Sequence, residues 1–163
     1  MRLPTPLRMA ALISGGGRTV LNLLDWIDAG RLPGSMQLVL ANKDCAGVER
    51  IRERGVPVDV LRASDFGGTA ARDAELFDRL RAAQVDVVLL AGYLARIEIP
   101  SDFEHRVINI HPSLIPAFCG QGMFGDNVHA AVIQRGCKVT GCTVHFCDNE
   151  YDHGPIIAQR VVP

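Results

Sequence analysis

Residues 85–91, VDVVLLA, form the segment that most constrains how this chain can fold. Every residue of the segment except Asp86 is apolar, and a strand without a polar face must be covered on both sides. Strands of this kind are typical of parallel sheets, in which helices pack on the two faces. The segment therefore predicts a central parallel strand of an α/β sheet.

The rest of the chain alternates between short apolar runs and segments of helical periodicity. Apolar residues recur at helical spacing from Val20 to Ile27, and Gly30 ends this helix. The other expected helices cover 46–54, 70–83 and 128–135, and the other expected strands cover 9–14, 36–41, 58–61, 107–110, 138–147 and 156–162. The expected apolar face of the third helix consists of Ala74, Leu76, Leu80 and Ala83. This order predicts an α/β fold with a mostly parallel twisted sheet, helices on both faces and last strands that are partly antiparallel.

The composition limits the classes of protein to which the chain can belong. Its 163 residues, 48% hydrophobic and 21% charged, predict a single globular domain. A formal net charge of -1 gives no argument for a nucleic-acid or membrane partner. No apolar run approaches the roughly 20 residues of a membrane-spanning helix. The five cysteines are odd in number and irregularly spaced, which favours reduced thiols in the cytoplasm.

Gly15, Gly16 and Gly17 lie between the first expected strand and the first expected helix. Backbone N–H groups in such a loop, together with the helix N-terminus, favour an anion. The loop lacks the Gly-Lys-Ser/Thr of a P-loop, and Val20 stands where a dinucleotide-binding loop has its third glycine. A phosphate site and a tight turn without a ligand are both open alternatives.

Asn109 and His111 stand two residues apart where the 107–110 strand ends. Residues at i and i+2 of a strand point to the same face, and open α/β sheets bind ligands at the carboxyl ends of strands. An amide that donates beside an imidazole that carries a proton can stabilise an oxyanion and move protons. The alternative is a capping asparagine and a solvated loop histidine.

The acidic turn 148–155, DNEYDHGP, joins the last two expected strands. Asp152 in this turn can approach His111 if the two strand ends are neighbours. A carboxylate in that place would favour the imidazolium form of the histidine. An ordinary hydrophilic hairpin is the alternative.

Three possible metal ligands, Cys142, His145 and Cys147, lie in the 138–147 strand. Strand alternation leaves only His145 and Cys147 on one face. No CxxC or HxxxH pair accompanies them, so a metal site is not expected. The cysteines are interpreted as small core residues.

Four segments of the chain match a known family in their order along the sequence: LISGGGRT, VLLAGYLARI, NIHPSLIPAF and GCTVHFCDNEYDHGPIIAQ. With them the chain resembles the glycinamide ribonucleotide formyltransferases of purine biosynthesis, within the wider family of 10-formyltetrahydrofolate-dependent formyltransferases. The resemblance covers nearly the whole chain. It implies a Rossmann-like formyltransferase fold, with residues 1–163 as a single formyltransferase domain.

The resemblance also implies roles for individual residues. The implied catalytic residues are Asn109, His111 and Asp152. The implied binding site for the phosphate of glycinamide ribonucleotide consists of Gly15, Gly17, Arg18 and Thr19. The implied folate-binding residues are Arg72, Leu94, Ala95, Arg96, Ile97, Asn109, Asp148, Asn149, Glu150 and Tyr151. The match at Arg72 is looser, and a solvated charge on a helix is the alternative there.

The activity that the resemblance implies is transfer of the formyl group from 10-formyltetrahydrofolate, the co-substrate, to the amine of glycinamide ribonucleotide without a metal. The implied enzyme is cytoplasmic, is a monomer or homodimer, and has no nucleic-acid or membrane partner. Two other functions stay open. One is a formyltransferase that acts on another amine, such as an amino sugar nucleotide, and the other is a module that binds nucleotide or folate without catalysis.

Three features depart from the family pattern. Arg18 lies in the glycine loop where relatives often have asparagine or serine, and Ala95 stands where many relatives carry a basic residue. The chain ends at Pro163, whereas family members usually continue into a C-terminal helix. We expect that the sheet lacks this helix, that an apolar strip is exposed in its place, and that the ribonucleotide binds more weakly.

Overall fold

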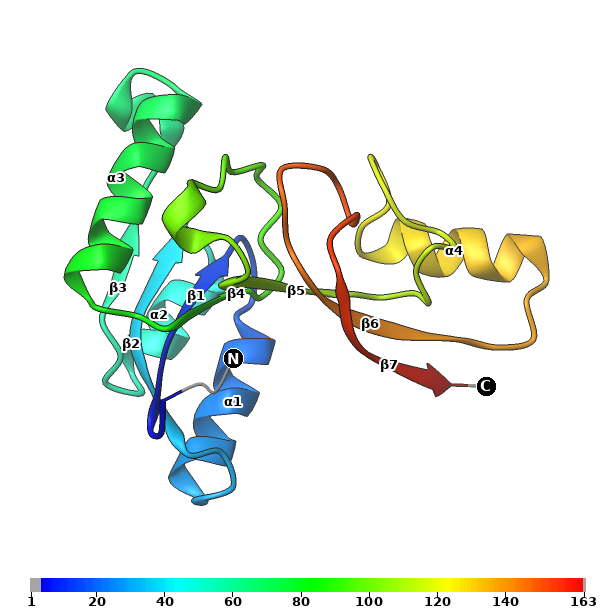
Figure 1. Cartoon of the computed structure of the whole chain (residues 1–163), viewed down its shortest axis with the longest axis horizontal. Helices are drawn as coiled ribbons and strands as arrows, with labels where there is room; N and C mark the ends of the chain where they lie inside the picture. The colour runs from blue at the N-terminus through cyan, green and yellow to red at the C-terminus, as the bar shows by residue number, and fades with distance from the viewer. Residues whose placement is uncertain (1–3, 163) are drawn as a thin grey trace. The chain divides into compact units, whose positions relative to one another are not determined.

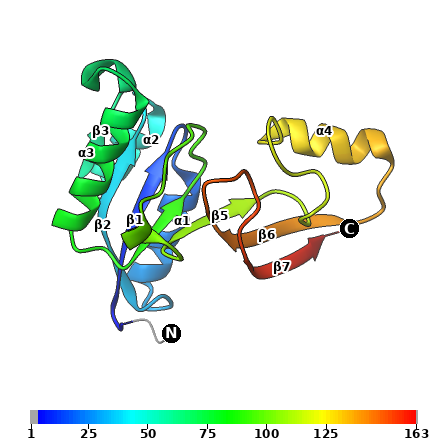
Figure 2. The ribbon, with the colours of Figure 1, turned by 45° about the horizontal axis from the view of Figure 1, so that its top comes forward.

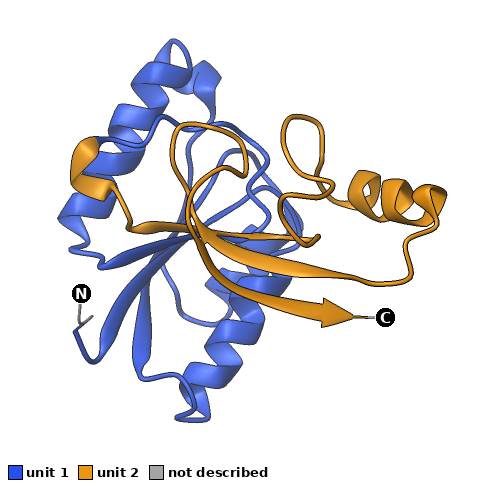
Figure 3. Ribbon diagram, turned by 45° about the vertical axis from the view of Figure 1, so that its right-hand side comes forward, with its two compact units in different colours: residues 1–100 blue, residues 101–163 orange. Residues whose placement is uncertain are grey.

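The computed structural model of the protein describes residues 4–162. The chain divides into two compact units, Met1–Pro100 and Ser101–Pro163, which Figure 3 shows in different colours. Strands and helices follow one another in the order that the sequence predicts. Between residues 4 and 162, no helix combines the length and the apolar character that crossing a membrane requires.

The first unit is a parallel α/β layer. Its elements are β1 (Leu7–Ile13), α1 (Arg18–Asp28), β2 (Gly34–Ala41), α2 (Ala46–Arg52), β3 (Val58–Val60), the 3₁₀ turn η1 (Ala63–Phe66), α3 (Thr69–Ala82) and β4 (Val87–Leu90). The strand order is β3-β2-β1-β4, and the three neighbouring pairs are all parallel. Parallel neighbours need crossover connections, which the helices supply. The predicted parallel sheet is confirmed here.

Helices cover both faces of this sheet, as Figures 1 and 2 show. Successive residues of β1 point to opposite faces, and all of them from Met9 to Ile13 are buried. On one face, Ala11 packs in a cluster with Val20 of α1 and Ile51 of α2. On the other face lies α3. Because both faces are covered, strands of this sheet need no polar side, which explains their apolar sequences.

α3 buries a somewhat different face from the predicted one. Leu76 and Leu80 are buried as expected, but Ala74 is exposed and Phe77 is buried. Alanines lie on several sides of this helix, so the apolar pattern defines its orientation poorly. The large aromatic side chain of Phe77 has far more apolar surface to remove from water, and it decides which side faces the sheet.

The second unit is antiparallel. Its elements are the 3₁₀ turn η2 (Ser101–Phe103), β5 (Val107–His111), α4 (Asp126–Arg135), β6 (Thr140–Phe146) and β7 (Ile156–Val162). β6 pairs antiparallel with both β5 and β7, which confirms the prediction for the last strands. β7 is exposed along its whole length, and its exposed apolar side chains include Ile156, Ile157 and Val161. An apolar strip is therefore exposed on this strand.

The predicted element boundaries differ from the observed ones by no more than two residues. β5 extends to His111, so this residue belongs to the strand and not to the turn after it. The sequence pattern does not indicate η1 and η2, because a single 3₁₀ turn is too short to show a periodic pattern.

Gly47 lies where α2 meets the loop of residues 15–17. Its N–H donates a hydrogen bond to the Gly15 carbonyl oxygen at 3.0 Å. A Cβ atom at Gly47 would lie 2.5 Å from that oxygen and 2.9 Å from the Gly17 nitrogen. The close approach of the helix to the loop therefore requires a residue without a side chain.

We expect Gly47→Ala to lower the free energy of unfolding by about 1–3 kcal/mol, because the added methyl group forces α2 away from the loop. Urea unfolding at neutral pH measures this change. Gly15→Ala is the matched control, since a Cβ at Gly15 meets no atom within 4 Å. Its free energy of unfolding should change by less than about 0.5 kcal/mol. An unfolding midpoint equal to that of the wild type in Gly47→Ala would contradict the packing argument.

Candidate active site

Asn109 and His111 project from the same face of β5. The antiparallel neighbour, β6, places His145 opposite Asn109 and Thr143 opposite His111. His111, Thr143 and His145 are all buried. The pairing of these two strands thus gathers two imidazoles and an amide on one face of the second unit.

Asp152 completes this cluster from the turn between β6 and β7. Its Oδ2 atom lies 3.4 Å from His111 Nδ1 and accepts a hydrogen bond from the Gly120 N–H at 2.9 Å. Its Oδ1 atom lies 3.6 Å from His145 Nε2 and 3.5 Å from Asn109 Nδ2. The expected approach of Asp152 to His111 is present, because the β6–β7 turn returns the chain to the end of β5.

The carboxyl group of Asp152 is ionised in this setting. Burial acts to raise its pKa, but the neighbouring His145 imidazole, the Gly120 N–H and the charge of His111 act in the opposite direction. The outcome is a pKa for Asp152 below its ordinary value of 3.8. At neutral pH the carboxylate presents a fixed negative charge to the two imidazoles beside it.

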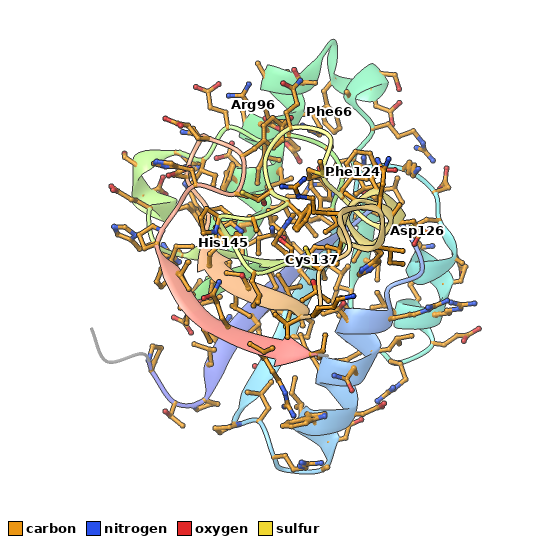
Figure 4. The ribbon with its side chains drawn as sticks, turned by 90° about the vertical axis from the view of Figure 1, so that its right-hand side faces the viewer. Phe66, Arg96, Phe124, Asp126, Cys137 and His145 are labelled. Atoms are coloured by element: carbon orange, nitrogen blue, oxygen red, sulfur yellow. The ribbon has the colours of Figure 1, made fainter. Side chains whose placement is uncertain are left out.

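His145, labelled in Figure 4, belongs to the cluster, although its sequence context suggested no role for it other than that of a possible metal ligand. Its Nδ1 lies 2.9 Å from the Phe146 carbonyl oxygen, which can only accept, so Nδ1 carries the hydrogen. In the neutral ring Nε2 is then an acceptor, and Asn109 Nδ2 donates to it at 3.2 Å. His145 therefore orients the Asn109 amide. The pairing register alone reveals this contact, since 36 positions separate the two residues.

The loop after β5 contacts the other nitrogen of His111. His111 Nε2 donates to the Phe118 carbonyl oxygen at 2.8 Å. Phe118 has a φ of 52°, a left-handed conformation that costs a residue with a side chain about 1–2 kcal/mol. The Ser113 hydroxyl donates to the Ala117 carbonyl at 2.6 Å, and the Thr143 hydroxyl donates to the Ser113 carbonyl at 2.7 Å. These bonds hold the loop against His111.

The turn that carries Asp152 has a framework of its own. Asp148 Oδ1 accepts the Glu150 N–H at 2.9 Å, and Asp148 Oδ2 lies 2.8 Å from His153 Nδ1. Burial opposes ionisation of Asp148, but the hydrogen bonds from His153 and Glu150 hold its pKa below the ordinary value. The same ion pair raises the pKa of His153. The exposed residues of the turn include Asp148, Asn149, Glu150 and Tyr151.

In the first unit, α1 begins directly after the glycine loop. Gly17 precedes the helix with a φ of 69°, a conformation that glycine adopts without strain. A Cβ at Gly17 would lie 3.0 Å from Ile51 Cδ1, so this position also has little room. Arg18 and Thr19 form the first turn of α1, and both are exposed. The N–H groups of a first helical turn lack partners inside the helix, so they favour an anion.

Asn42 follows β2 beside the same end of the sheet, and its N–H lies 3.4 Å from the carbonyl oxygen of Ile13. Its Oδ1 atom is buried and has no hydrogen-bond partner within residues 4–162. A buried acceptor without a partner is costly. Asn42 therefore offers an acceptor to a ligand at this end of the first unit, and no sequence motif indicated it.

The loop expected to contact folate follows β4. Leu94 and Arg96 are exposed, Ala95 is half-buried and Ile97 is buried, and Arg96 is labelled in Figure 4. Arg72 is only 2% exposed, so the alternative of a solvated helix charge is wrong. Its Nη2 donates to the Arg96 carbonyl oxygen at 2.8 Å. The structure thus gives Arg72 a contact with the loop, and a direct contact with folate stays a prediction.

Within the described part of the chain, no three His, Cys, Asp or Glu side chains come together in a way that could hold a metal ion. The cysteines Cys45, Cys119, Cys137, Cys142 and Cys147 are free thiols. Burial, together with the charges of Asp152 and Asp148, raises the pKa of Cys147 to about 12. This thiol is therefore protonated at neutral pH and is a poor nucleophile.

Comparisons with known proteins give one family. The family model described as formyl transferase matches residues 7–163. The phosphoribosylglycinamide formyltransferase of Escherichia coli (strain K12) is 35% identical over 161 residues, which cover 96% of this chain and 73% of that protein. The chloroplastic enzyme of the same name from Vigna unguiculata is 42% identical over 159 residues, covering 96% of this chain. The chain spans about half of that relative's length, 51%.

The solved structures agree. In the crystal structure of glycinamide ribonucleotide transformylase 1 from Symbiobacterium toebii, the matching chain is 40% identical and gives a TM-score of 0.88. The match covers 96% of this chain and 73% of that one. The predicted Rossmann-like formyltransferase fold is confirmed by this likeness. By its family match, its sequence identities and its structure, the chain belongs to the formyl transferase family.

Proposed function

We propose that the protein transfers a formyl group from 10-formyltetrahydrofolate to the amine of glycinamide ribonucleotide. The observation that carries the proposal is the Asp152 carboxylate, which lies 3.4 Å from His111 Nδ1 and 3.5 Å from Asn109 Nδ2. An amide donor, an imidazole and a half-buried carboxylate are suited to acyl transfer through an oxyanion. The names of the Escherichia coli and Vigna relatives support the choice of substrate.

The reaction balances with groups of this kind. The neutral amine attacks the formyl carbon, a C–N bond forms, and the carbonyl electron pair moves onto oxygen to give a tetrahedral oxyanion. Collapse of the oxyanion breaks the bond between the formyl carbon and N10 of the folate. The attacking nitrogen loses one proton and N10 gains one. Protonated His111 gives the proton to N10 and regains the proton that the amine loses, while Asp152 stabilises the imidazolium.

An N–H of Asn109 stabilises the oxyanion. Its long contact with Asp152, 3.5 Å, is exchanged for the substrate oxygen, while the bond to His145 at 3.2 Å keeps the amide oriented. A donor of this kind typically lowers the barrier by about 2.7–4 kcal/mol. For His111 to reach the substrate through Nε2, its bond to the Phe118 carbonyl has to open.

The binding groups come from several segments. Gly15, Gly17, Arg18 and Thr19 bind the phosphate through backbone N–H groups and the charge of the arginine. Leu94, Ala95, Arg96 and Ile97 bind the folate, as do the exposed residues of the 148–151 turn. The family match runs through both compact units, which supports the proposal that residues 1–163 act as one formyltransferase domain. We assign the enzyme to the cytoplasm, as a monomer or homodimer that uses small-molecule substrates and no nucleic acid.

Asp152→Asn should lower kcat by about a hundredfold or more, because the neutral amide no longer stabilises the imidazolium of His111. Formylated ribonucleotide formed from the two substrates gives the rate. Glu104→Gln, which changes an exposed acid of the same unit, is the control and should keep the wild-type rate. Wild-type turnover in Asp152→Asn would refute the assigned role. Formylation of an amino sugar nucleotide in preference to glycinamide ribonucleotide would favour the alternative acceptor.

The lowered pKa of Asp152 makes the stability of the protein depend on pH. The folded state favours the carboxylate, so its stabilising effect is complete above the unfolded-state pKa, near 3.8, and is lost as the pH falls through the lower folded-state pKa. Wild type and Asp152→Asn should therefore differ in free energy of unfolding by about 1–3 kcal/mol at neutral pH. In urea unfolding below pH 3.8 the two values should converge. A difference that persists unchanged in strong acid would contradict the ionised state of Asp152.

Arg18→Ala should raise the KM for glycinamide ribonucleotide about tenfold, because a charge-assisted contact with the phosphate is lost. The kcat and the KM for folate should stay near the wild-type values. Arg31→Ala, which removes an exposed arginine just beyond the other end of α1, serves as the control. If Arg18 acts through charge, its effect should also shrink at high salt. An unchanged KM for the ribonucleotide would exclude Arg18 from the phosphate site.

A further inference from the structure

We propose that Asp73, together with Arg72, is a positioning pair that holds residues 92–98, called here the 92–98 loop, in the shape that receives the folate. The choice of folate as ligand rests on the proposed function. The geometric part, that the pair on α3 fixes the loop, depends only on contacts inside the first unit.

Arg72 and Asp73 are neighbours near the start of α3, and both are buried, at 2% and 8% exposed. Arg72 Nε donates to Asp73 Oδ1 at 2.8 Å, and Arg72 Nη2 lies 2.5 Å from the same oxygen. A buried ion pair of this kind loses the hydration of both charges, and apolar side chains of similar size would often stabilise a fold as well. The pair is therefore poorly explained by stability alone.

Both side chains also make hydrogen bonds with the backbone of the loop. Arg72 Nη2 donates to the Arg96 carbonyl oxygen at 2.8 Å. Asp73 Oδ2 accepts the Glu98 N–H at 3.0 Å. The guanidinium and the carboxylate together hold a backbone acceptor and a backbone donor that are two residues apart.

The beginning of the same loop is held by Ser14, a buried residue that follows β1. Its N–H donates to the Gly92 carbonyl oxygen at 3.1 Å. Its Oγ accepts the Leu94 N–H at 2.9 Å. The 92–98 loop is therefore anchored through its backbone at both ends, by Ser14 at one and by the α3 pair at the other.

Between these anchors, the side chains of Leu94 and Arg96 are exposed, while Ile97 is buried. A fixed backbone that carries exposed side chains is a pre-organised binding edge, because a ligand that contacts it does not have to order it first. If the contacts of Arg72 and Asp73 with the loop were lost, each binding event would have to include the entropic cost of ordering the loop. Weaker folate binding with unchanged chemistry is the expected consequence.

Asp73→Asn tests this. Asparagine has one side-chain oxygen where Asp73 has two, so it cannot accept hydrogen bonds from both the Arg72 guanidinium and the Glu98 N–H. The loop should therefore be released at Glu98. We expect the KM for 10-formyltetrahydrofolate to rise about tenfold, while kcat and the KM for glycinamide ribonucleotide stay within about twofold. In the ligand-free enzyme, hydrogen exchange at the amides of the 92–98 loop should become faster.

Asp78→Asn is the matched control, since Asp78 pairs with Arg81 at 2.7 Å on the exposed side of the same helix. It should leave both KM values and the exchange of the loop unchanged. A purely structural role for Asp73 would lower the unfolding midpoint without altering the folate KM or the loop exchange. That result would overturn the proposal.

If Asp73→Asn fails to fold, Arg72→Lys replaces it. Lysine keeps the charge opposite Asp73 but lacks the fork that reaches the carboxylate and the Arg96 carbonyl together. It should raise the folate KM and speed exchange near Arg96, and wild-type values for both would overturn the proposal. If the wild type transfers no formyl group, the proposed function fails. In that case, hydrogen exchange of the 92–98 loop in the ligand-free variants tests the anchoring by Arg72 and Asp73 on its own. Faster exchange supports the anchoring, and unchanged exchange contradicts it.

Discussion

The arrangement of the second unit depends on the half-buried carboxylate of Asp152. One oxygen accepts the Gly120 N–H and faces His111, and the other lies near Asn109 and His145. Burial alone would oppose its ionisation, so the polar neighbours are what keep it charged. The dependence is mutual, because without the carboxylate the surrounding donors would be buried with fewer partners. The same group therefore links the structure of the cluster to its proposed chemistry.

Backbone strain accompanies this cluster. Asp152 and Phe118 both have a φ of 52°, although neither is glycine, and both contact His111. Gly154 lies in the same turn as Asp152, and a Cβ there would collide with the Phe146 carbonyl oxygen. Unfavourable backbone conformations persist where surrounding contacts determine them, and they are common at functional sites. Here they place a carboxylate and a carbonyl oxygen at the two nitrogens of one imidazole.

The two compact units contribute different kinds of groups to the proposed function. The first unit offers backbone groups: the N–H groups of the glycine loop and the fixed backbone of the 92–98 loop. The second unit offers side chains that transfer a proton, as His111 does, or that stabilise a charge, as Asn109 and Asp152 do. If folate is bound through the backbone of the 92–98 loop, the identity of a side chain there matters less.

Local features of the sequence were enough to identify the order of the elements, the parallel character of the first sheet, and the pairing of Asn109 with His111 on one face. Apolar periodicity and a spacing of two residues depend only on neighbouring positions. The motifs that resemble the formyltransferases also pointed to Asp152 in advance. Asp152 lies close to His111 because the turn after β6 returns to the end of β5, with which β6 pairs antiparallel.

The tertiary structure alone decided which groups meet. The contact of His145 with Asn109 depends on the register of β5 and β6, and the bond from His111 to Phe118 depends on the path of a loop. The orientation of α3, which buries Arg72 and turns it toward the 92–98 loop, depends on packing against the sheet. Register, loop path and helix orientation arise from contacts between segments far apart in the chain. Local periodicity carries no information about such contacts, so only the folded chain could reveal them.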